Sequence, residues 1–599
     1  MNHQQPQPIL DAFRFTIMTS SLLTLAASPP LRTSFASYWL DALVILAYFG
    51  LIMGIGFSQR SKSETVEGFS LGDRQTPWWA VLASIIAAEI SAATFLGAPG
   101  EGYSLRNWTY IQLAIGAILG RVFVSAVFIP AYYKHNVISI YEFLQTRFGM
   151  LSRKAASFTF LLTRVLAIGT RLYVSAIIVV LAYEMFLGRA VEPMEKFWIF
   201  SGALVFISLM TAIYTTAGGI RAVIWTDFIQ MGILVAAVGF SIYFLMGQIT
   251  GGMAGVWNQI KPPVFLETGL QEASWGSKAW LEYVLAGLQK GSWAASSWWE
   301  NMNHTFELRT FGAKPWWEYI FTNEYTIWAG FLGSSFVTMA THGIDQDTVQ
   351  RMLTAKNTRQ SGFATIVSGL LDVPIVSAFI FIGILLSIYY QQNTYLYTVP
   401  SAAREVFPHF ILHVMPAGLR GLVAAGILAT AMGSLSTALN ALATSFARDF
   451  ILKDEPNDLP VSERIPESQR VRVLRWSTLL FAGLIVLVGV ITSYFMAKHP
   501  DARIIPLVLG IMGYTFGSLL GIFFVALFTK KRGSDFGNVL AMICGCLAVI
   551  LMSHQEVQRW VGIHHPLEFE FPWRVMIGTL MTFGVAVFFR TPAREPHAL

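Results

Sequence analysis

Small side chains that carry oxygen recur along the stretch 421–449, GLVAAGILATAMGSLSTALNALATSFARD. This stretch is long enough to cross a bilayer as a helix, and it holds no charged residue between Arg420 and Arg448. At about 100° per residue, its polar and small residues share one arc, opposite an arc of larger apolar residues. The first arc holds Thr430, Gly433, Ser434, Ser436, Thr437, Asn440 and Thr444, and the second holds Leu428, Met432, Leu435, Leu439 and Leu442. Neutral hydroxyl and carbonyl oxygens suit a hard cation that must bind and then leave, although the stripe alone is more typical of a helix–helix interface.

A carboxylate, Glu89, lies in the middle of another predicted span, which begins near Trp78. A charged side chain at mid-membrane is costly and usually functional. Ser91 and Thr94 follow it, and small polar residues here indicate a helix that interrupts its own hydrogen bonding and exposes carbonyls to an ion. We expect this span to end at Gly97, Pro99 and Gly100. The alternative is a structural glutamate paired with a neighbouring arginine.

Three arginines lie inside predicted spans. Arg164 and Arg171 share one face of a helix at i,i+7, and Arg121 lies in the span before, where its side chain could extend to the interface. One of the first two could neutralise Glu89, or it could hold an anionic group of a substrate. A further carboxylate, Asp227, lies a few residues into the span that follows Gly218 and Gly219, two glycines that allow a tight turn. It could be a cation ligand or cap a neighbouring turn.

The composition is that of a polytopic membrane protein. Of 599 residues, 54% are hydrophobic and only 13% are charged, against about 25% charged in soluble domains. We attribute the net charge of +6 to basic residues in cytoplasmic loops, and it does not indicate a nucleic-acid partner. The sequence has no phosphate-binding loop, no HExxH and no zinc spacing, and Cys544 and Cys546 lie inside an apolar segment. An ATP-driven pump or an enzyme is therefore not expected.

Hydropathy predicts an all-α protein with about thirteen transmembrane helices. These lie at about 39–57, 76–97, 110–133, 155–187, 197–215, 222–246, 317–340, 362–390, 421–446, 473–496, 504–528, 536–552 and 573–589. Residues 1–36 are an ambiguous extension, and 247–318 form a tryptophan-rich segment that we expect outside the membrane, along its surface. Lysine and arginine gather in alternate loops, which predicts an external N-terminus and a cytoplasmic C-terminus in a bacterial-type inner membrane.

Three motifs in register resemble the sodium:solute symporter family, which includes the sodium–glucose and sodium–proline cotransporters. They are TAGGIRAVIWTDFIQ at 216–230, GIDQDTVQRMLTAKN at 343–357, and the stretch 421–449. The resemblance runs from about Trp39 to Phe528. It implies a LeuT-like fold of two inverted five-helix repeats, at 76–246 and 319–528, with an extra first helix and loop at 37–75 and accessory helices at 529–599.

The resemblance also implies sodium ligands. The main site would use the carbonyls of Ala87, Ile90 and Thr430 and the hydroxyl of Ser434. Family members usually have a serine where this chain has Gly433, so one hydroxyl ligand is missing, and a Thr430 side-chain oxygen or water would replace it. A second site would fall on Asp227, Ser436 and Thr437.

Substrate is expected beside the sodium, between the first, third, sixth and tenth core helices of the family. The candidates are Glu89, Ser91, Thr94, Arg171 and Tyr514. Glu89 is not typical of the sugar or proline transporters. A Glu89–Arg171 pair could hold a polyol, whereas a free Arg171 could hold a carboxylate, so sugar, sugar acid and amino acid stay open.

The resemblance predicts a symporter that imports a small organic solute with sodium by alternating access, and that functions as a monomer. Two alternatives stay open. Proton coupling could operate through Glu89 or Asp227, and Gly433 could weaken sodium binding enough to give an uncoupled transporter or a sensor that does not transport.

Overall fold

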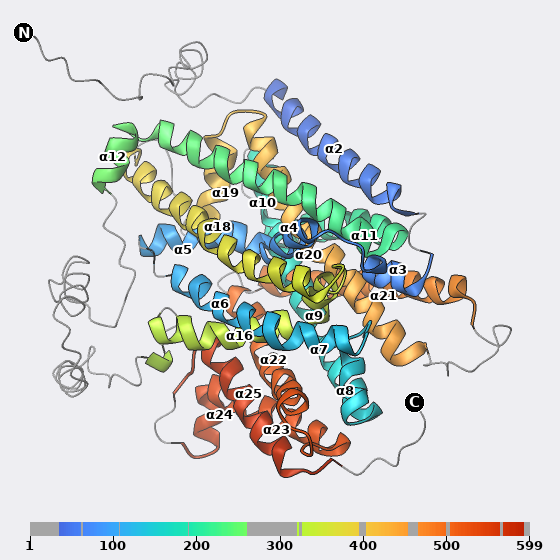
Figure 1. The fold of residues 1–599 in the computed structure, drawn as a ribbon. Helices are drawn as coiled ribbons and strands as arrows, with labels where there is room; N and C mark the ends of the chain where they lie inside the picture. Colours follow the sequence, from blue (N-terminus) through green and yellow to red (C-terminus); the bar gives the residue numbers. More distant parts are fainter. Residues whose placement is uncertain are drawn as a thin grey trace, which may run out of the picture.

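The computed structural model describes residues 35–60, 64–106, 108, 110–187, 189, 191–259, 320–322, 326–394, 403–452, 465–498, 504–563 and 567–591. The predicted extension 1–36 and the tryptophan-rich segment 247–318 lie mostly outside them. The described chain is a bundle of helices (Figure 1).

The first half of the described chain runs from the extra first helix to the start of the tryptophan-rich segment. Its elements are α2 (Phe35–Ser58), α3 (Val66–Leu71), η3 (Gly72–Arg74), α4 (Trp78–Glu89), α5 (Ala92–Leu105), α6 (Ile111–Phe123), η4 (Val124–Phe128), α7 (Ile129–Lys134), α8 (Tyr141–Arg147), α9 (Met150–Ser175), α10 (Ile177–Leu187), α11 (Pro193–Gln248) and α12 (Gly252–Gln259).

The second half contains the polar stripe and the C-terminal helices. Its elements are η5 (Ala329–Gly333), α16 (Ser334–Gly343), α17 (Gln346–Met352), α18 (Thr358–Gln392), α19 (Ala403–His413), α20 (Leu419–Phe446), η6 (Ala447–Ile451), α21 (Glu467–Lys498), α22 (Ile504–Phe528), α23 (Asp535–Ser553), α24 (Gln555–Trp560) and α25 (Phe571–Phe588).

Helix α20 carries the oxygen stripe. In its span, 89% of the apolar 18-residue stretch is buried, a larger share than in any other span among the described residues. It packs against α11, α21, α9, α2 and α4, and it lies at the centre of the ribbon in Figure 1. Large apolar side chains on α2, α11 and α21, such as Trp39, Trp198 and Trp476, are exposed, as expected for a surface that faces lipid. Both arcs of α20 are therefore inside the protein, and its polar arc faces other helices.

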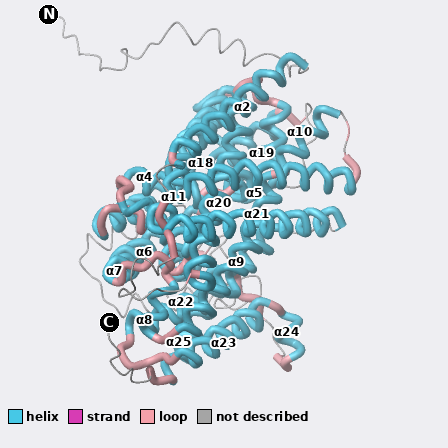
Figure 2. Tube along the Cα trace, turned by 90° about the vertical axis from the view of Figure 1, so that its right-hand side faces the viewer, coloured by secondary structure: helices cyan, strands magenta, loops and turns pink. Residues whose placement is uncertain are grey.

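The C-terminal helices form a separate group at one end of the molecule. Figures 1 and 2 both show α22, α23 and α25 together at the end opposite α2. Helix α25 packs against α22 and α23, and α22 also contacts α9. The group joins the bundle through all three helices, because α23 also contacts α9 and α25 contacts α16.

The span that carries Glu89 is broken, at a place close to the one expected. Helix α4 ends at Glu89, Ile90 has non-helical φ and ψ of −79° and 88°, and Ser91 caps α5. The two helices are bent by 60°. The expectation that the span ends at 97–100 is wrong, because α5 continues through Pro99 to Leu105. Tight packing against α18 explains this: a Cβ at Gly383 would lie 2.1 Å from the Pro99 carbonyl oxygen.

The two spans predicted at 197–215 and 222–246 lie on either side of a kink inside α11. Gly219 has φ 57° and ψ −152°, and a Cβ there would lie 2.6 Å from the Phe69 carbonyl oxygen, so the turn requires glycine. Among the described residues, nine helices are long and apolar enough to cross a membrane, or ten if α4 and α5 count as one span. The predicted number of about thirteen is therefore not confirmed.

Candidate functional site

The break between α4 and α5 releases backbone carbonyls toward α20. The Ser91 amide donates to the Glu89 carbonyl at 3.0 Å, instead of to the Ala87 carbonyl four residues back, as a continuous helix requires. The Ser434 hydroxyl of α20 donates to the Ala88 carbonyl at 3.4 Å. The structure thus places Ser434 beside the break, at the carbonyl next to that of Ala87, and Ile90 lies buried at the break itself.

The hydroxyl groups on the α20 stripe donate mainly to their own helix. Thr430 donates to the Ile427 carbonyl at 2.7 Å, Ser436 to the Gly433 carbonyl at 3.1 Å, and Thr437 to the Gly433 carbonyl at 2.9 Å. Each such hydroxyl keeps its oxygen lone pairs for another partner. These side chains can therefore accept or coordinate while their protons are already satisfied.

Asp227 faces the same stripe from α11. It is fully buried, and its Oδ2 accepts a 2.6 Å hydrogen bond from Ser84 of α4. Its Oδ1 lies 3.5 Å from the point where a Cβ on Gly433 would be. The carboxylate that was predicted for a second sodium site is thus next to the residue that departs from the family pattern at the first.

A small cavity, with room for about one water molecule, joins the break, α9 and α20. It is lined by Ser91, Ala92, Ile168, Arg171, Leu172, Ser175, Thr430, Ala431, Ser434 and Leu435. The Arg171 Nη2 atom lies 3.0 Å from the Met512 Sδ atom of α22. The Thr94 amide donates to the Ser91 hydroxyl at 3.4 Å, at the start of α5. The cavity therefore holds two of the predicted substrate residues, Ser91 and Arg171, beside two of the predicted sodium ligands, Thr430 and Ser434.

Glu89 turns toward other helices. Its Oε2 lies 2.7 Å from Arg121 Nη2 on α6, and its Oε1 contacts His342 Nε2 on α16. Arg121 also lies 3.6 Å from Asp372 of α18. No ion pair joins Glu89 to Arg171 in the part of the chain that the structure describes. The structural alternative, a glutamate paired with an arginine, is what the structure shows, and Arg121 is buried instead of extending to the interface.

Arg164, the other candidate partner of Glu89, belongs to a different buried cluster. It contacts Asp347, and it lies 3.1 Å from Asp345. Asp347 also accepts from Arg351 at 2.7 Å. Burial raises the pKa of Asp345, and the guanidinium groups of Arg164 and Arg351 oppose that rise. These carboxylates belong to the motif at 343–357, so this motif fixes α17 against α9.

Tyr514 does not line the cavity. Its hydroxyl is 2.8 Å from His554 Nε2, and the two rings are stacked. The helix that carries it, α22, does reach the cavity region through Met512, which contacts Arg171. Tyr514 is thus kept away from the cavity by its contact with His554, at the start of α24.

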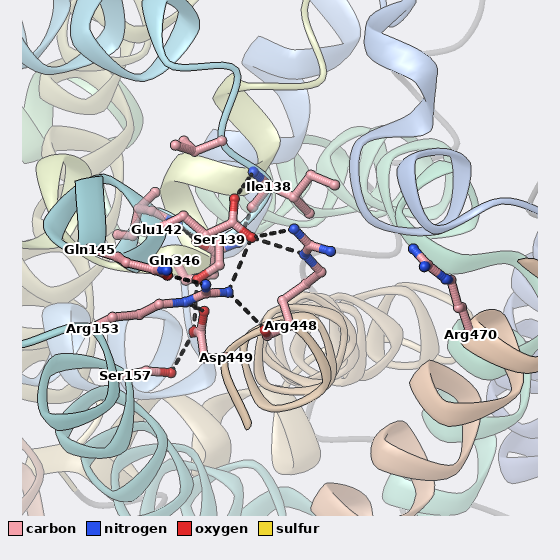
Figure 3. Close-up of polar contacts among 12 residues, drawn as sticks. Ile138, Ser139, Glu142, Gln145, Arg153, Ser157, Gln346, Arg448, Asp449 and Arg470 are labelled. Atoms are coloured by element: carbon pink, nitrogen blue, oxygen red, sulfur yellow. Dashed lines mark hydrogen bonds and ion pairs between the residues drawn. The ribbon is translucent and has the colours of Figure 1, made fainter. Parts of the chain in front are cut away.

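A network of ion pairs holds the end of α20 to α8 and α9 (Figure 3). Asp449 Oδ1 lies 2.8 Å from Arg153 Nε, and Asp449 Oδ2 accepts from Ser139 at 2.8 Å and from Ser157 at 2.6 Å. Arg448 lies 2.9 Å from Glu142 on α8. The network lies one turn beyond the oxygen stripe, so it fixes the end of the helix that carries the proposed ligands.

The family's sequence model, "Sodium:solute symporter family", matches residues 69–545 of the chain. The chain belongs to the sodium:solute symporter family. The match confirms the predicted family, and with it a sodium-coupled transporter of a small solute and not an enzyme.

Individual members of the family resemble the chain along most of their length. The sodium/sialic acid symporter SiaT of Proteus mirabilis is 28% identical over 86% of this chain and 89% of its own. The sodium/sialic acid symporter NanT of Aliivibrio fischeri is also 28% identical, over 90% and 91%. Sodium-coupled monocarboxylate transporter 2 of Danio rerio is 25% identical over 87% of this chain and 71% of its own.

The fold of this symporter matches that of a solved relative. A Na⁺-coupled sialic acid symporter in a substrate-bound, outward-open state superposes with a TM-score of 0.68 and 23% identity, over 92% of this chain and 97% of that one. This similarity confirms the predicted LeuT-like fold class.

Sequence reasoning missed two residues of this symporter that matter for the site. His342 contacts Glu89, and Gln230 reaches Gly433 from α11. Both lie in or next to the motifs that carry the family resemblance, at 216–230 and 343–357. Their positions within those motifs were a signal, but only the packing shows which helix each one faces.

Proposed function

We propose that this symporter imports a small organic carboxylate together with sodium. The observation that carries the proposal is the position of Arg171 on the wall of the cavity that also contains Ser434. Among the described residues, Arg171 has no carboxylate within ion-pair distance. A guanidinium inside the membrane needs a counter-charge, and its planar fork matches a carboxylate through two parallel hydrogen bonds. The sialic acid and monocarboxylate symporters among its relatives also bear the names of acids.

The proposed sodium sites lie between this cavity and α11. The main site uses the carbonyl groups of Ala87, Ile90 and Thr430 and the hydroxyl of Ser434. Oxygen ligands of this kind suit a hard cation, and an interrupted helix supplies carbonyls that no longer accept hydrogen bonds within the helix. The Ser434 hydroxyl, which already faces the break, supports this assignment.

The second sodium site uses Asp227, Ser436 and Thr437. Asp227 brings the full negative charge, and the two hydroxyl groups lie on α20, which packs against α11. The carboxylate would compensate one sodium charge inside the membrane. Arg171 would pair with the solute's charge on the other side of α20.

Alternating access would follow from two inverted repeats at 76–246 and 319–528, with 37–75 and 529–599 as accessory parts. We place the Asp449–Arg153 network on the cytoplasmic side, because Lys and Arg gather in the loops at that end. The N-terminus would then lie outside and the C-terminus in the cytoplasm, in a bacterial-type inner membrane. One chain contains every proposed ligand, so we propose that the monomer is the functional unit.

A solute screen by thermal shift, with and without sodium, tests this function. Purified protein would be heated in sodium chloride or choline chloride with a sugar acid, a short monocarboxylate, a neutral sugar or a neutral amino acid. A ligand that binds only the folded state raises the melting temperature. We expect a rise with a carboxylate, larger in sodium than in choline. Stabilisation by the neutral sugar alone, or by a carboxylate equally in both salts, would contradict the proposal.

A further inference from the structure

We propose that Gln230 of α11 is a direct sodium ligand at Gly433, in place of the hydroxyl that this chain lacks. The ion would be shared by the Gln230 side-chain oxygen, Asp227 Oδ1 and the Ala87 carbonyl. The inference rests on the proposed function, since it assumes that sodium binds between α4, α11 and α20. It differs in assigning a ligand that the family pattern does not supply.

Three oxygen atoms converge on the space next to Gly433. A Cβ placed on this glycine would lie 2.8 Å from Gln230 Oε1, 3.5 Å from Asp227 Oδ1 and 3.6 Å from the Ala87 carbonyl oxygen. They come from a side-chain amide, a carboxylate and the carbonyl released at the helix break. These are the ligand types that hard cations take in proteins.

Two of these oxygens are buried without a hydrogen-bond partner. Gln230 is 2% exposed and Asp227 is fully buried, and no described residue donates a hydrogen bond to Gln230 Oε1 or to Asp227 Oδ1. A buried acceptor without a partner is costly, and two acceptors that face one space repel each other. A cation in that space would satisfy both oxygens at once.

The orientation of the Gln230 amide is set from the other side. Its Nε2 donates to the Tyr48 hydroxyl at 3.2 Å, and that hydroxyl in turn donates to Met432 Sδ at 3.4 Å. Tyr48 belongs to α2, the extra helix before the proposed repeats, and it is buried against α11 and α20. Because the nitrogen is used by Tyr48, the oxygen is the atom that faces Gly433.

Glycine at position 433 is what makes room for this ligand. A Cβ at 2.8 Å from Gln230 Oε1 is closer than side-chain carbons normally approach, so any larger residue would displace the amide. Gly433 and Gln230 thus act as a pair: the small residue opens the space, and the long one reaches into it. The missing hydroxyl is compensated by the amide oxygen, and sodium binding is retained.

Sodium titrations of purified variants by thermal shift test the pair, with choline chloride holding ionic strength constant. We expect Gln230→Leu and Gly433→Ala each to raise the half-maximal sodium concentration about tenfold or more, as for the loss of a contact to a charged group. Gln230→Glu, which keeps an oxygen, should retain sodium binding.

Matched controls separate a ligand from a packing defect. Gln112→Leu removes a buried amide of α6 whose side chain has no hydrogen-bond partner among the described residues either, and Gly426→Ala adds a methyl group to α20 at 3.0 Å from Ala237 of α11. Both controls should keep the wild-type sodium midpoint. If Gln230→Leu does not fold, Gly433→Ala decides the question.

The outcomes with these variants distinguish a failure of the proposed function from a failure of the role of Gln230. Wild-type protein without a sodium-dependent shift would overturn the proposed function and the inference with it. A sodium response that Ser434→Ala weakens, but that Gln230→Leu and Gly433→Ala leave intact, would overturn only the role of Gln230. Loss of the response in Gln230→Leu and Gly433→Ala, with both controls unchanged, would support the inference.

Discussion

Arg121 of α6 and Glu89 of α4 form an ion pair at the helix break, with Nη2 and Oε2 2.7 Å apart. His342 contacts the other carboxylate oxygen, and Asp372 approaches the same arginine. Glu89 is the last residue of α4, so this pair ties the end of the broken helix to α6, α16 and α18. The Glu89 carboxylate therefore holds the break in place, next to the carbonyls that the proposed sodium site uses.

Replacing Arg121 by Met should destabilise the protein by about 3–5 kcal/mol, because it leaves buried carboxylates without their cation. Thermal unfolding of the purified protein measures this loss. Glu568→Gln breaks a half-exposed pair with Arg574 and should cost less than about 1 kcal/mol. The double variant Arg121→Met with Glu89→Gln should recover part of the loss, and no recovery would show that the two charges do not interact.

Replacing Arg171 by Met should weaken binding of the carboxylate solute by about 10- to 100-fold, because a charge-assisted contact is lost. Isothermal titration in saturating sodium measures it. Arg171→Lys keeps the charge without the planar fork, so its affinity for the solute should lie between that of wild type and that of Arg171→Met. Sodium-dependent stabilisation in the absence of solute should stay at the wild-type level. Unchanged solute affinity in Arg171→Met would exclude Arg171 from the substrate site.

Asp449→Asn should raise the half-maximal sodium concentration severalfold, although Asp449 is not a proposed ligand. The network that Asp449 forms with Arg153 fixes the end of α20 (Figure 3). If that fixed arrangement is the sodium-binding state, weakening it lowers the fraction of competent protein and the apparent affinity. A sodium titration by thermal shift measures the change. Glu195→Gln, at an exposed pair, is the control, and equal midpoints in the two variants would show that the network does not influence sodium binding.

Acidification should destabilise the protein through His409 of α19. Burial lowers the pKa of His409 to about 4, and the stacked His413 ring adds to this effect. The neutral ring is therefore favoured in the folded state, and its contribution to stability is complete above about pH 6.5 and is lost as the pH falls toward about 4. Melting temperatures between pH 8 and pH 5 should fall less in His409→Gln than in wild type. Parallel pH profiles would assign the acid sensitivity to another group.

The sequence was sufficient to predict most of the apolar helices and the polar stripe, since hydropathy and a period near 3.6 depend only on local order, although the predicted number of about thirteen spans is not confirmed. It also predicted an interruption near Glu89. Ser91 and Arg171, which it assigned to a substrate site beside the sodium, line the same cavity as Ser434. It did not show which arginine forms an ion pair with Glu89, because that depends on which faces of α6 and α9 are turned toward α4. The continuation of α5 through Pro99 was missed for a similar reason: close packing on Gly383 outweighs local helix-breaking residues.

Sodium bound where the α4–α5 break meets α20 should drive the solute inward. Uptake of a radiolabelled carboxylate into proteoliposomes, with an inward sodium gradient and equal solute on both sides at the start, tests it most directly. We expect accumulation above equilibrium that collapses with a sodium ionophore, is absent in choline, and is strongly reduced in Ser434→Ala. Accumulation of equal extent in sodium and in choline, or full activity of Ser434→Ala, would contradict it.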